Sequence, residues 1–318
     1  MEQKILVSVI MPCYNGEEFL KEALDSFANN KRDDFELIIV DDGSIDDSPN
    51  IIVNFKQNNE CNIRYYRIDN HGVSYARNYG LSKASGDYIL FLDCDDCYSS
   101  SFIESMLDFS ITSNSDLVFC YWNNNNKKNI NTKSRSVKKK AFASIMLYHN
   151  KNVHLCSILY RKSIIDTYEI RFREDLKYGE DLDFVWKYLV HCDTFFFNSK
   201  CFYYHRDNTK SAVHKFSLSK IDTIELANDN FSMIETYYPC FLKRVEKYAV
   251  QRNVLAVQKE LARNNKKDMF DFIRTKYSKL SYSNLLFHDS LANRIASLLY
   301  IVSPSLFFFI LRKIWGTK

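Results

Sequence analysis

The stretch Tyr88-Ile-Leu-Phe-Leu-Asp-Cys-Asp-Asp96 joins an unbroken apolar run to a cluster of carboxylates. A short, wholly apolar run is typical of a strand buried on both faces of a parallel sheet. The aspartates follow at its carboxyl end, where open α/β sheets bind their ligands. Clustered carboxylates repel one another unless a cation joins them, and Mg²⁺ and Mn²⁺ are held by carboxylates together with substrate phosphates. The stretch therefore predicts a metal–diphosphate site or, since aspartate also favours caps and turns, a structural turn.

An alternation of strands and helices extends to both sides of this stretch. The apolar patterns predict strands at 6–11, 35–40, 63–68, 88–92 and 117–121, and helices at 17–29, 49–57, 73–82 and 102–111. Further along, they predict a helix at 182–191 and short strands at 194–197 and 202–205. Strands that alternate with helices in this way form right-handed βαβ units. The predicted fold class is α/β, with a mostly parallel sheet flanked by helices.

The C-terminal third has a different pattern. Residues 219–277 predict polar-faced helices, and residues 295–311 are mostly apolar, interrupted at Pro304 and flanked by basic residues. A bilayer-spanning helix needs about 20 apolar residues, so this interrupted run favours a helix pair lying at a membrane surface. The alternative is a helix that packs on the rest of the protein. We expect a catalytic domain at 1–215, a helical extension at 216–285 and an amphipathic tail at 286–318.

Composition limits the classes of function. With 318 residues and a net charge of +4, the chain is long enough for a sizeable core and too weakly basic to indicate nucleic acid. The 9 cysteines are scattered, which favours a reducing compartment, and the polar N-terminus predicts no signal peptide.

Residues 123–140 carry lysines and arginines without an acid, which predicts a solvated loop or a basic rim facing phosphates. We expect a cytoplasmic protein attached peripherally to the inner face of the cell membrane, and a homo-oligomer is compatible with the sequence.

Two predicted strands end in acidic residues. Asp41-Asp42 follows the second strand and Asp93–Asp96 follows the fourth, so both clusters are expected at the same edge of the sheet. One could hold a nucleotide and the other its diphosphate and metal. No Walker loop or G-x-G-x-x-G sequence is present, so the diphosphate would be neutralised by a metal and by basic side chains. Arg77, on the preceding helix, is a candidate, although a surface position is the alternative.

Several motifs occur in the order found in family 2 glycosyltransferases with the GT-A fold, and the chain resembles that family over roughly residues 5–210. The motifs that carry the resemblance are Val7-Ser-Val-Ile-Met-Pro-Cys-Tyr-Asn15, Ile38-Ile-Val-Asp-Asp-Gly-Ser44, Gly72-Val-Ser-Tyr-Ala-Arg-Asn-Tyr-Gly80, Gly86-Asp-Tyr-Ile-Leu-Phe-Leu-Asp-Cys-Asp-Asp96 and Gly179-Glu-Asp181. Each motif is weak alone, and their order makes the set specific. The C-terminal third is similar only in general terms to membrane-associated members that assemble bacterial polysaccharides.

The resemblance implies a donor site at the start of the chain. Pro12, Tyr14 and Asn15 would line the nucleotide-base pocket, with the Tyr14 ring against the base. Asp41 would hydrogen-bond the base, and Arg77 would lie beside the base or the diphosphate.

The resemblance also implies the metal ligands and the base. Asp93 would contact the ribose or the metal, Asp95 would bind the metal, and His205 lies where some relatives place a further ligand. Asp181 would be the general base, and Glu180 would shape the acceptor side. For Asp181 the residues alone leave open a helix N-terminus, where acids are favoured.

The implied activity is transfer of a sugar from a nucleotide-diphosphate donor, expected to be a UDP-sugar, with inversion and with Mn²⁺ or Mg²⁺. The acceptor would be a hydroxyl of a glycan or lipid-linked glycan in capsule, exopolysaccharide or cell-surface glycan synthesis. Two alternatives are a sugar-nucleotide pyrophosphorylase and an inactive membrane-bound scaffold. Pyrophosphorylases rely on a glycine-rich loop after the first strand, and residues 12–17 of this chain do not match such a loop. Other histidines show no metal-ligand spacing and are expected to be structural or exposed; they are His71, His149, His154, His191, His214 and His288.

Overall fold

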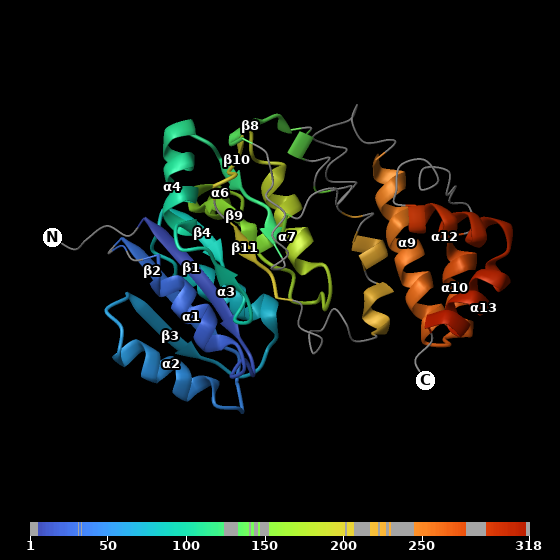
Figure 1. Cartoon of the computed structure of the whole chain (residues 1–318), viewed down its shortest axis with the longest axis horizontal. Helices are drawn as coiled ribbons and strands as arrows, with labels where there is room; N and C mark the ends of the chain where they lie inside the picture. The colour runs from blue at the N-terminus through green and yellow to red at the C-terminus, as the bar shows by residue number, and fades with distance from the viewer. Residues whose placement is uncertain are drawn as a thin grey trace. The chain divides into compact units, whose positions relative to one another are not determined.

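The computed structural model describes most of the chain as two compact units. Described are residues 6–30, 32, 34–123, 133–139, 141–142, 146, 153–200, 202–206, 217–221, 223–226, 229, 245–277 and 291–315. One unit comprises residues 1–176 and 180–208, and the other comprises 177–179 and 209–318. Figure 1 draws the first in blue to yellow-green and the second mainly in orange and red.

The first unit is built on an eight-stranded sheet with the order β3-β2-β1-β4-β9-β6-β10-β8. Its strands are β1 (Val7–Cys13), β2 (Phe35–Asp41), β3 (Ile63–Arg67), β4 (Tyr88–Phe91), β6 (Leu117–Phe119), β8 (Arg135–Val137), β9 (Ile158–Arg161) and β10 (Phe195–Phe197). Strands β1 to β4 are parallel to one another, and β10 is parallel to β6. Strand β9 runs antiparallel between β4 and β6, and β8 is an antiparallel edge strand. The prediction of a mostly parallel sheet flanked by helices is confirmed.

Apolar runs explain the centre of this sheet. Every residue of β1 and β2 is buried, as expected for strands covered on both faces. The helices of this unit are α1 (Leu20–Ala28), α2 (Ser48–Gln57), α3 (Val73–Lys83), α4 (Phe102–Ser113), α6 (Lys162–Thr167) and α7 (Glu180–Leu189). Helix α3 packs against β1 and β2, and a Cβ at Gly80 would lie 2.4 Å from Ile10 Cγ2. Glycine at this position therefore permits the close approach of α3 to the sheet.

A smaller sheet lies beside the acidic turn that follows β4. It has the order β5-β11-β7, with β5 at Cys97–Tyr98, β11 at Tyr203–Tyr204 and β7 at Trp122–Asn123. Strand β11 is antiparallel to β5 and parallel to β7. This pairing brings the residues that follow β11 to the turn at residues 93–96.

Part of the basic segment at 123–140 differs from the expected loop. Residues Arg135–Val137 form β8, which pairs with β10 at the edge of the large sheet. Both Arg135 and Ser136 are exposed, in keeping with an edge strand that presents polar side chains to solvent. Residues 124–132 and 140 of this segment lie outside the described residues, and the expectation of a basic rim at 123–140 stays a prediction.

The second unit is helical where it is described. Its elements are the 3₁₀ helix η3 (Leu218–Ile221), α9 (Val245–Arg263), α10 (Lys267–Lys276), α12 (Leu291–Val302) and α13 (Pro304–Trp315). Helices α10 and α13 pack against α9, and α12 packs against α13. Pro304 starts α13, where its missing N–H costs little, and Ser303 Oγ accepts the Leu306 N–H at 3.3 Å. The expected helix pair is therefore present, with its break at the proline.

The pair of C-terminal helices has one face buried and one face exposed. On the buried side, Tyr300, Phe307 and Phe308 pack around the Phe270 ring of α10. The exposed side carries apolar residues at Ile295, Leu298, Ile301, Val302, Leu306 and Phe309. Among the described helices, none combines the length and the apolar character needed to cross a bilayer.

Candidate active site

The carboxyl ends of β1, β2 and β4 meet at one edge of the large sheet. Cys13 at the end of β1 pairs with Asp41 at the end of β2, and Ile10 pairs with Phe91 at the end of β4. The turns that follow these strands therefore lie together, as the sequence predicted from the parallel arrangement.

The turns after β1 and β2 are tied by reciprocal hydrogen bonds. The Asn15 N–H donates to Ser44 Oγ at 3.0 Å, and the Ile45 N–H donates to Asn15 Oδ1 at 2.9 Å. Asn15 adopts a φ of +50°, which asparagine tolerates better than most residues. Pro12 is buried in β1, whereas the Tyr14 residue is 50% exposed. Tyr14 thus offers an accessible ring beside a braced loop, an arrangement suited to stacking on a flat ligand.

Asp41 is fully buried and holds its own turn. Its Oδ1 accepts the Ser44 N–H at 2.8 Å, and its Oδ2 accepts the Tyr65 hydroxyl at 3.0 Å. Arg67 Nε lies 3.6 Å from the same Oδ2. In this structure Asp41 therefore stabilises the turn that follows β2, and its predicted bond to a nucleotide base stays a prediction.

Arg77 bridges the acidic turn and the Glu-Asp motif. Its side chain is 5% exposed, with Nη2 at 2.9 Å from Asp93 Oδ1 and Nη1 at 3.1 Å from Glu180 Oε1. The guanidinium carbon also lies 5.3 Å from the centre of the Phe172 ring. Sequence reasoning placed Arg77 beside the donor, and the structure brings its charge to two carboxylates on other elements.

The pKa values of Asp93 and Glu180 are shifted in opposite directions. Burial opposes ionisation of Asp93, but the adjacent Arg77, together with His154 and Cys156, outweighs burial and holds the pKa of Asp93 below its usual range. Burial, together with the neighbouring Asp181 charge, raises the pKa of Glu180 to about 7 despite Arg77. Glu180 is therefore the less readily ionised partner of this bridge.

Asp96 is buried and anchors the segment after β11. Its carboxylate accepts the Tyr203 hydroxyl and, at 2.7 Å, the Arg206 N–H, and it lies 3.1 Å from His205 Nδ1. The bond to Asp96 raises the pKa of His205, although burial opposes the shift. With Nδ1 held in this way, Nε2 is the His205 nitrogen directed elsewhere, as in carboxylate–histidine pairs that orient metal ligands.

The residues predicted to hold a metal are partly brought together. Asp95 precedes Asp96 directly, and its backbone carbonyl accepts Arg206 Nε–H at 3.0 Å, which places it beside the His205 segment. The two carboxylates suit Mn²⁺ and Mg²⁺, whereas an imidazole nitrogen is a less usual ligand for either ion. Among the described residues, Asp93, Asp95 and His205 do not form a group whose ligand atoms all lie within 4.8 Å of one another.

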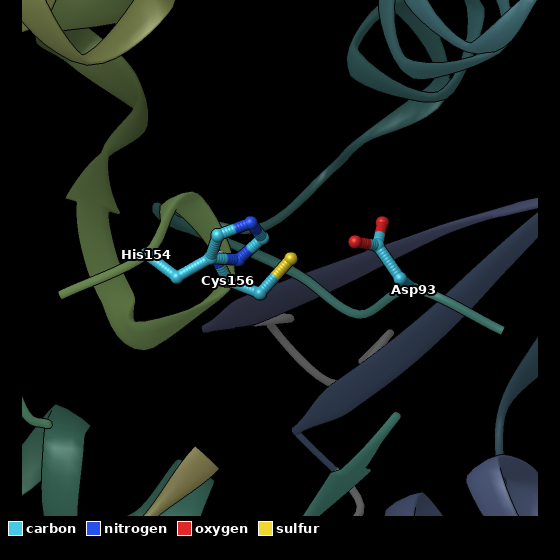
Figure 2. A group of neighbouring side chains, drawn as sticks. All are labelled: Asp93, His154 and Cys156. Atoms are coloured by element: carbon cyan, nitrogen blue, oxygen red, sulfur yellow. The ribbon is translucent and has the colours of Figure 1, made fainter. Parts of the chain in front are cut away.

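A different triad does meet that distance. Ligand atoms of Asp93, His154 and Cys156 lie within 4.8 Å of one another, and Figure 2 shows the His154 ring and the Cys156 thiol facing the Asp93 carboxylate. Burial raises the pKa of Cys156 well above its ordinary value, which disfavours the thiolate that a metal needs.

The two carboxylates of the Glu-Asp motif point to different surroundings. Glu180 is 14% exposed and pairs with Arg77, whereas Asp181 is 34% exposed in the first turn of α7. Asp181 Oδ1 accepts the Leu182 N–H at 2.7 Å. Of the two, Asp181 is placed to receive a proton from a bound molecule.

Sequence reasoning missed His154, which was expected to be structural or exposed. His154 Nε2 lies 3.6 Å from Asp181 Oδ2. No local signal marks this residue, because its approach depends on β9 entering the sheet antiparallel between β4 and β6.

Comparison with known proteins gives a consistent family assignment. The family model described as "Glycosyl transferase family 2" matches residues 8–169. Poly(ribitol-phosphate) beta-N-acetylglucosaminyltransferase TarP of Staphylococcus aureus is 28% identical over 291 residues, which cover 87% of this chain and 86% of TarP. The minor teichoic acid biosynthesis protein GgaA of Bacillus subtilis is 32% identical over 188 residues, or 56% of this chain and 42% of GgaA.

Solved structures share the fold at low sequence identity. S. aureus TarS 1-349 in complex with UDP-GlcNAc has a TM-score of 0.67 and 19% identity, covering 97% of this chain and 91% of that one. The mannosyltransferase PcManGT from Pyrobaculum calidifontis, in complex with GDP-Man and Mn²⁺, has a TM-score of 0.57 and 13% identity, covering 96% and 89%.

Proposed function

The chain belongs to glycosyl transferase family 2 and is a glycosyltransferase with the GT-A fold, and from this premise we propose an inverting, metal-dependent transfer from a UDP-sugar. The acceptor is a hydroxyl of a glycan or lipid-linked glycan in cell-surface polysaccharide synthesis. Support comes from the names of two relatives, a poly(ribitol-phosphate) beta-N-acetylglucosaminyltransferase and a minor teichoic acid biosynthesis protein, and from UDP-GlcNAc in the TarS complex. The sugar-nucleotide pyrophosphorylase alternative is set aside by the family.

The donor occupies the edge of the sheet formed by β1, β2 and β4. The half-exposed Tyr14 ring stacks on the base, and Pro12 and Asn15 line the base pocket. Asp41 holds the turn after β2 within reach of the base. Arg77 holds Asp93 at the diphosphate side through its 2.9 Å bond. The parallel register that brings these turns together is the observation that supports this placement.

Asp93, Asp95 and His205 would hold Mn²⁺ or Mg²⁺ on the donor side of the site. When bound, the ion would supply positive charge that stabilises the leaving diphosphate. Asp96 orients His205 for this role through its contact with Nδ1. Arg77 keeps Asp93 ionised, so that its carboxylate is available on the donor side.

Asp181 is the general base. It takes the proton of the acceptor hydroxyl while that oxygen attacks the anomeric carbon, and a single direct displacement inverts the anomeric configuration. Proton transfer of this kind contributes about 10²–10⁴ in rate. Glu180, held by Arg77, fixes the first turn of α7 on the acceptor side. The contrast in exposure between Asp181 and Glu180 is the observation that carries this assignment.

The C-terminal helix pair attaches the protein to the inner face of the cell membrane. Ile295, Leu298 and Val302 lie on one exposed face of α12 at helical spacing, and Arg312 and Lys313 lie in the last turn of α13. Apolar residues combined with basic ones suit an interface rich in anionic lipid. A homo-oligomer formed through the same apolar face is the competing use of this surface.

A donor screen tests the proposal as a whole. UDP release from a panel of UDP-sugars is measured with and without EDTA, and the anomeric configuration of the product is read by proton NMR. We expect release with at least one UDP-sugar, loss of release in EDTA, and inverted product. Retained configuration would contradict the single displacement, and a protein that binds UDP-sugars but never transfers would favour the inactive scaffold.

A further inference from the structure

The Nδ1 atom of His154 is held by the backbone that follows this residue. His154 precedes the 3₁₀ helix η1 (Leu155–Ser157), and its Nδ1 accepts the Cys156 N–H at 3.4 Å. The His154 N–H donates in return to Ser157 Oγ at 2.8 Å, which completes a capping box. Because Nδ1 accepts a hydrogen bond, the proton of the neutral ring lies on Nε2.

That Nε2 faces Asp181. The Nε2–Oδ2 distance is 3.6 Å, while the other carboxylate oxygen of Asp181 accepts the Leu182 N–H at 2.7 Å. A separation of 3.6 Å is longer than a hydrogen bond, but catalytic hydrogen bonds are often long before substrate binds. Each carboxylate oxygen of Asp181 therefore has a nitrogen donor near it: Leu182 N–H at Oδ1 and His154 Nε2 at Oδ2.

Two aromatic rings keep the His154 plane in this direction. The Tyr203 ring stacks on it with centroids 5.8 Å apart and planes at 13°, and the His205 ring lies at 5.7 Å and 26°. The His154 ring is thus constrained by its cap at one nitrogen and by flat neighbours on its faces. Such constraints restrict rotation of the ring, so that Nε2 stays aimed at Asp181.

We propose that His154 is a positioning residue for the transfer reaction, which uses its Nε2–H to orient the Asp181 carboxylate toward the acceptor hydroxyl. The inference rests on the proposed role of Asp181 as base. With Oδ1 held by Leu182 and Oδ2 by His154, rotation of the carboxylate is limited, and a remaining lone pair is presented to the hydroxyl proton. Residues that orient metal ligands in a comparable way typically contribute about 10- to 100-fold, and we expect a loss of the same order here.

Two substitutions separate this role from the capping role. In His154→Asn the amide reaches the position of Nδ1 and can still accept the Cys156 N–H, but nothing reaches Asp181. In His154→Gln the longer amide reaches the position of Nε2 and can donate to Asp181, but the cap is lost. We expect kcat of His154→Asn to fall about 10- to 100-fold with donor KM unchanged, and His154→Gln to recover most of this loss.

Controls keep the outcome interpretable. His191→Asn removes a histidine that stacks on Tyr168 beyond the far end of α7, and we expect wild-type kcat. UDP binding and the thermal unfolding midpoint of each variant report on folding. Full activity of His154→Asn, or activity in His154→Asn together with its loss in His154→Gln, would overturn the proposal. Asp181→Asn is assayed in parallel, because wild-type activity there would reject the base itself rather than the role of His154.

Discussion

Arg77 Nη1 lies 3.1 Å from Glu180 Oε1, and this ion pair joins α3 to α7 across 103 positions of sequence. The other terminal nitrogen of the same guanidinium contacts Asp93. A single buried cation thus connects the donor-side acidic turn to the helix that presents Asp181.

Removal of Arg77 should destabilise the fold. Arg77→Ala leaves the partly buried Asp93 and Glu180 without their counter-charge, and we expect the free energy of unfolding to fall by about 3–5 kcal/mol. Urea denaturation measures the change. Arg173→Ala is the matched control, since Arg173 pairs with Asp175 at the surface and such pairs contribute at most about 1 kcal/mol. Equal effects of the two substitutions would contradict the bridge.

Glu180 predicts a pH dependence of stability. Its pKa of about 7 in the folded protein lies above the ordinary value of 4.5, so the folded state binds more protons between these values. By linkage, the contribution of Glu180 to stability falls as pH rises through this window. We expect wild type to lose about 1–3 kcal/mol relative to Glu180→Gln between pH 4.5 and 7.5. A difference that is constant, or that grows in favour of wild type, would show that Glu180 is not held in this way.

Much of the donor edge could be predicted from the sequence, because β1, β2 and β4 are apolar runs that end in recognisable polar turns. The strands β5 (Cys97–Tyr98) and β7 (Trp122–Asn123) could not be predicted, because they are too short to show a periodic pattern. The contact between His154 and Asp181 was equally hidden, because it depends on the antiparallel insertion of β9 and on no local pattern. Arg77 was found as a residue of the site, but its partners follow only from the packing of α3 and α7.

Asp95 and His205 predict metal-dependent nucleotide binding. We expect UDP to bind more tightly with Mn²⁺ than in EDTA, and Asp95→Ala or His205→Ala to abolish that difference because each removes a proposed ligand. Isothermal titration calorimetry of UDP, with and without Mn²⁺, measures it. Unchanged metal dependence in both variants would place the ion elsewhere.

The exposed face of α12 predicts binding to anionic membranes. Val302 is 74% exposed, so Val302→Glu should leave folding intact and abolish co-sedimentation with phosphatidylglycerol vesicles. Val53→Glu, on exposed α2, is the matched control and should co-sediment as wild type does. Wild type that stays in the supernatant would refute the membrane role. If wild type sediments with a mass above that of a monomer and Val302→Glu restores the monomer mass, the exposed face of α12 binds a second copy of the chain instead.

The most direct test of the central claim is the turnover number of Asp181→Asn with the donor found by the UDP-sugar screen. The substitution preserves shape and removes the proton-accepting charge, so we predict a fall in kcat of about 10²–10⁴ with UDP binding close to wild type. Asp175→Asn, at an exposed carboxylate paired with Arg173, provides the same chemical change outside the site and should retain wild-type kcat. Wild-type kcat in Asp181→Asn would contradict the assignment of Asp181 as the general base.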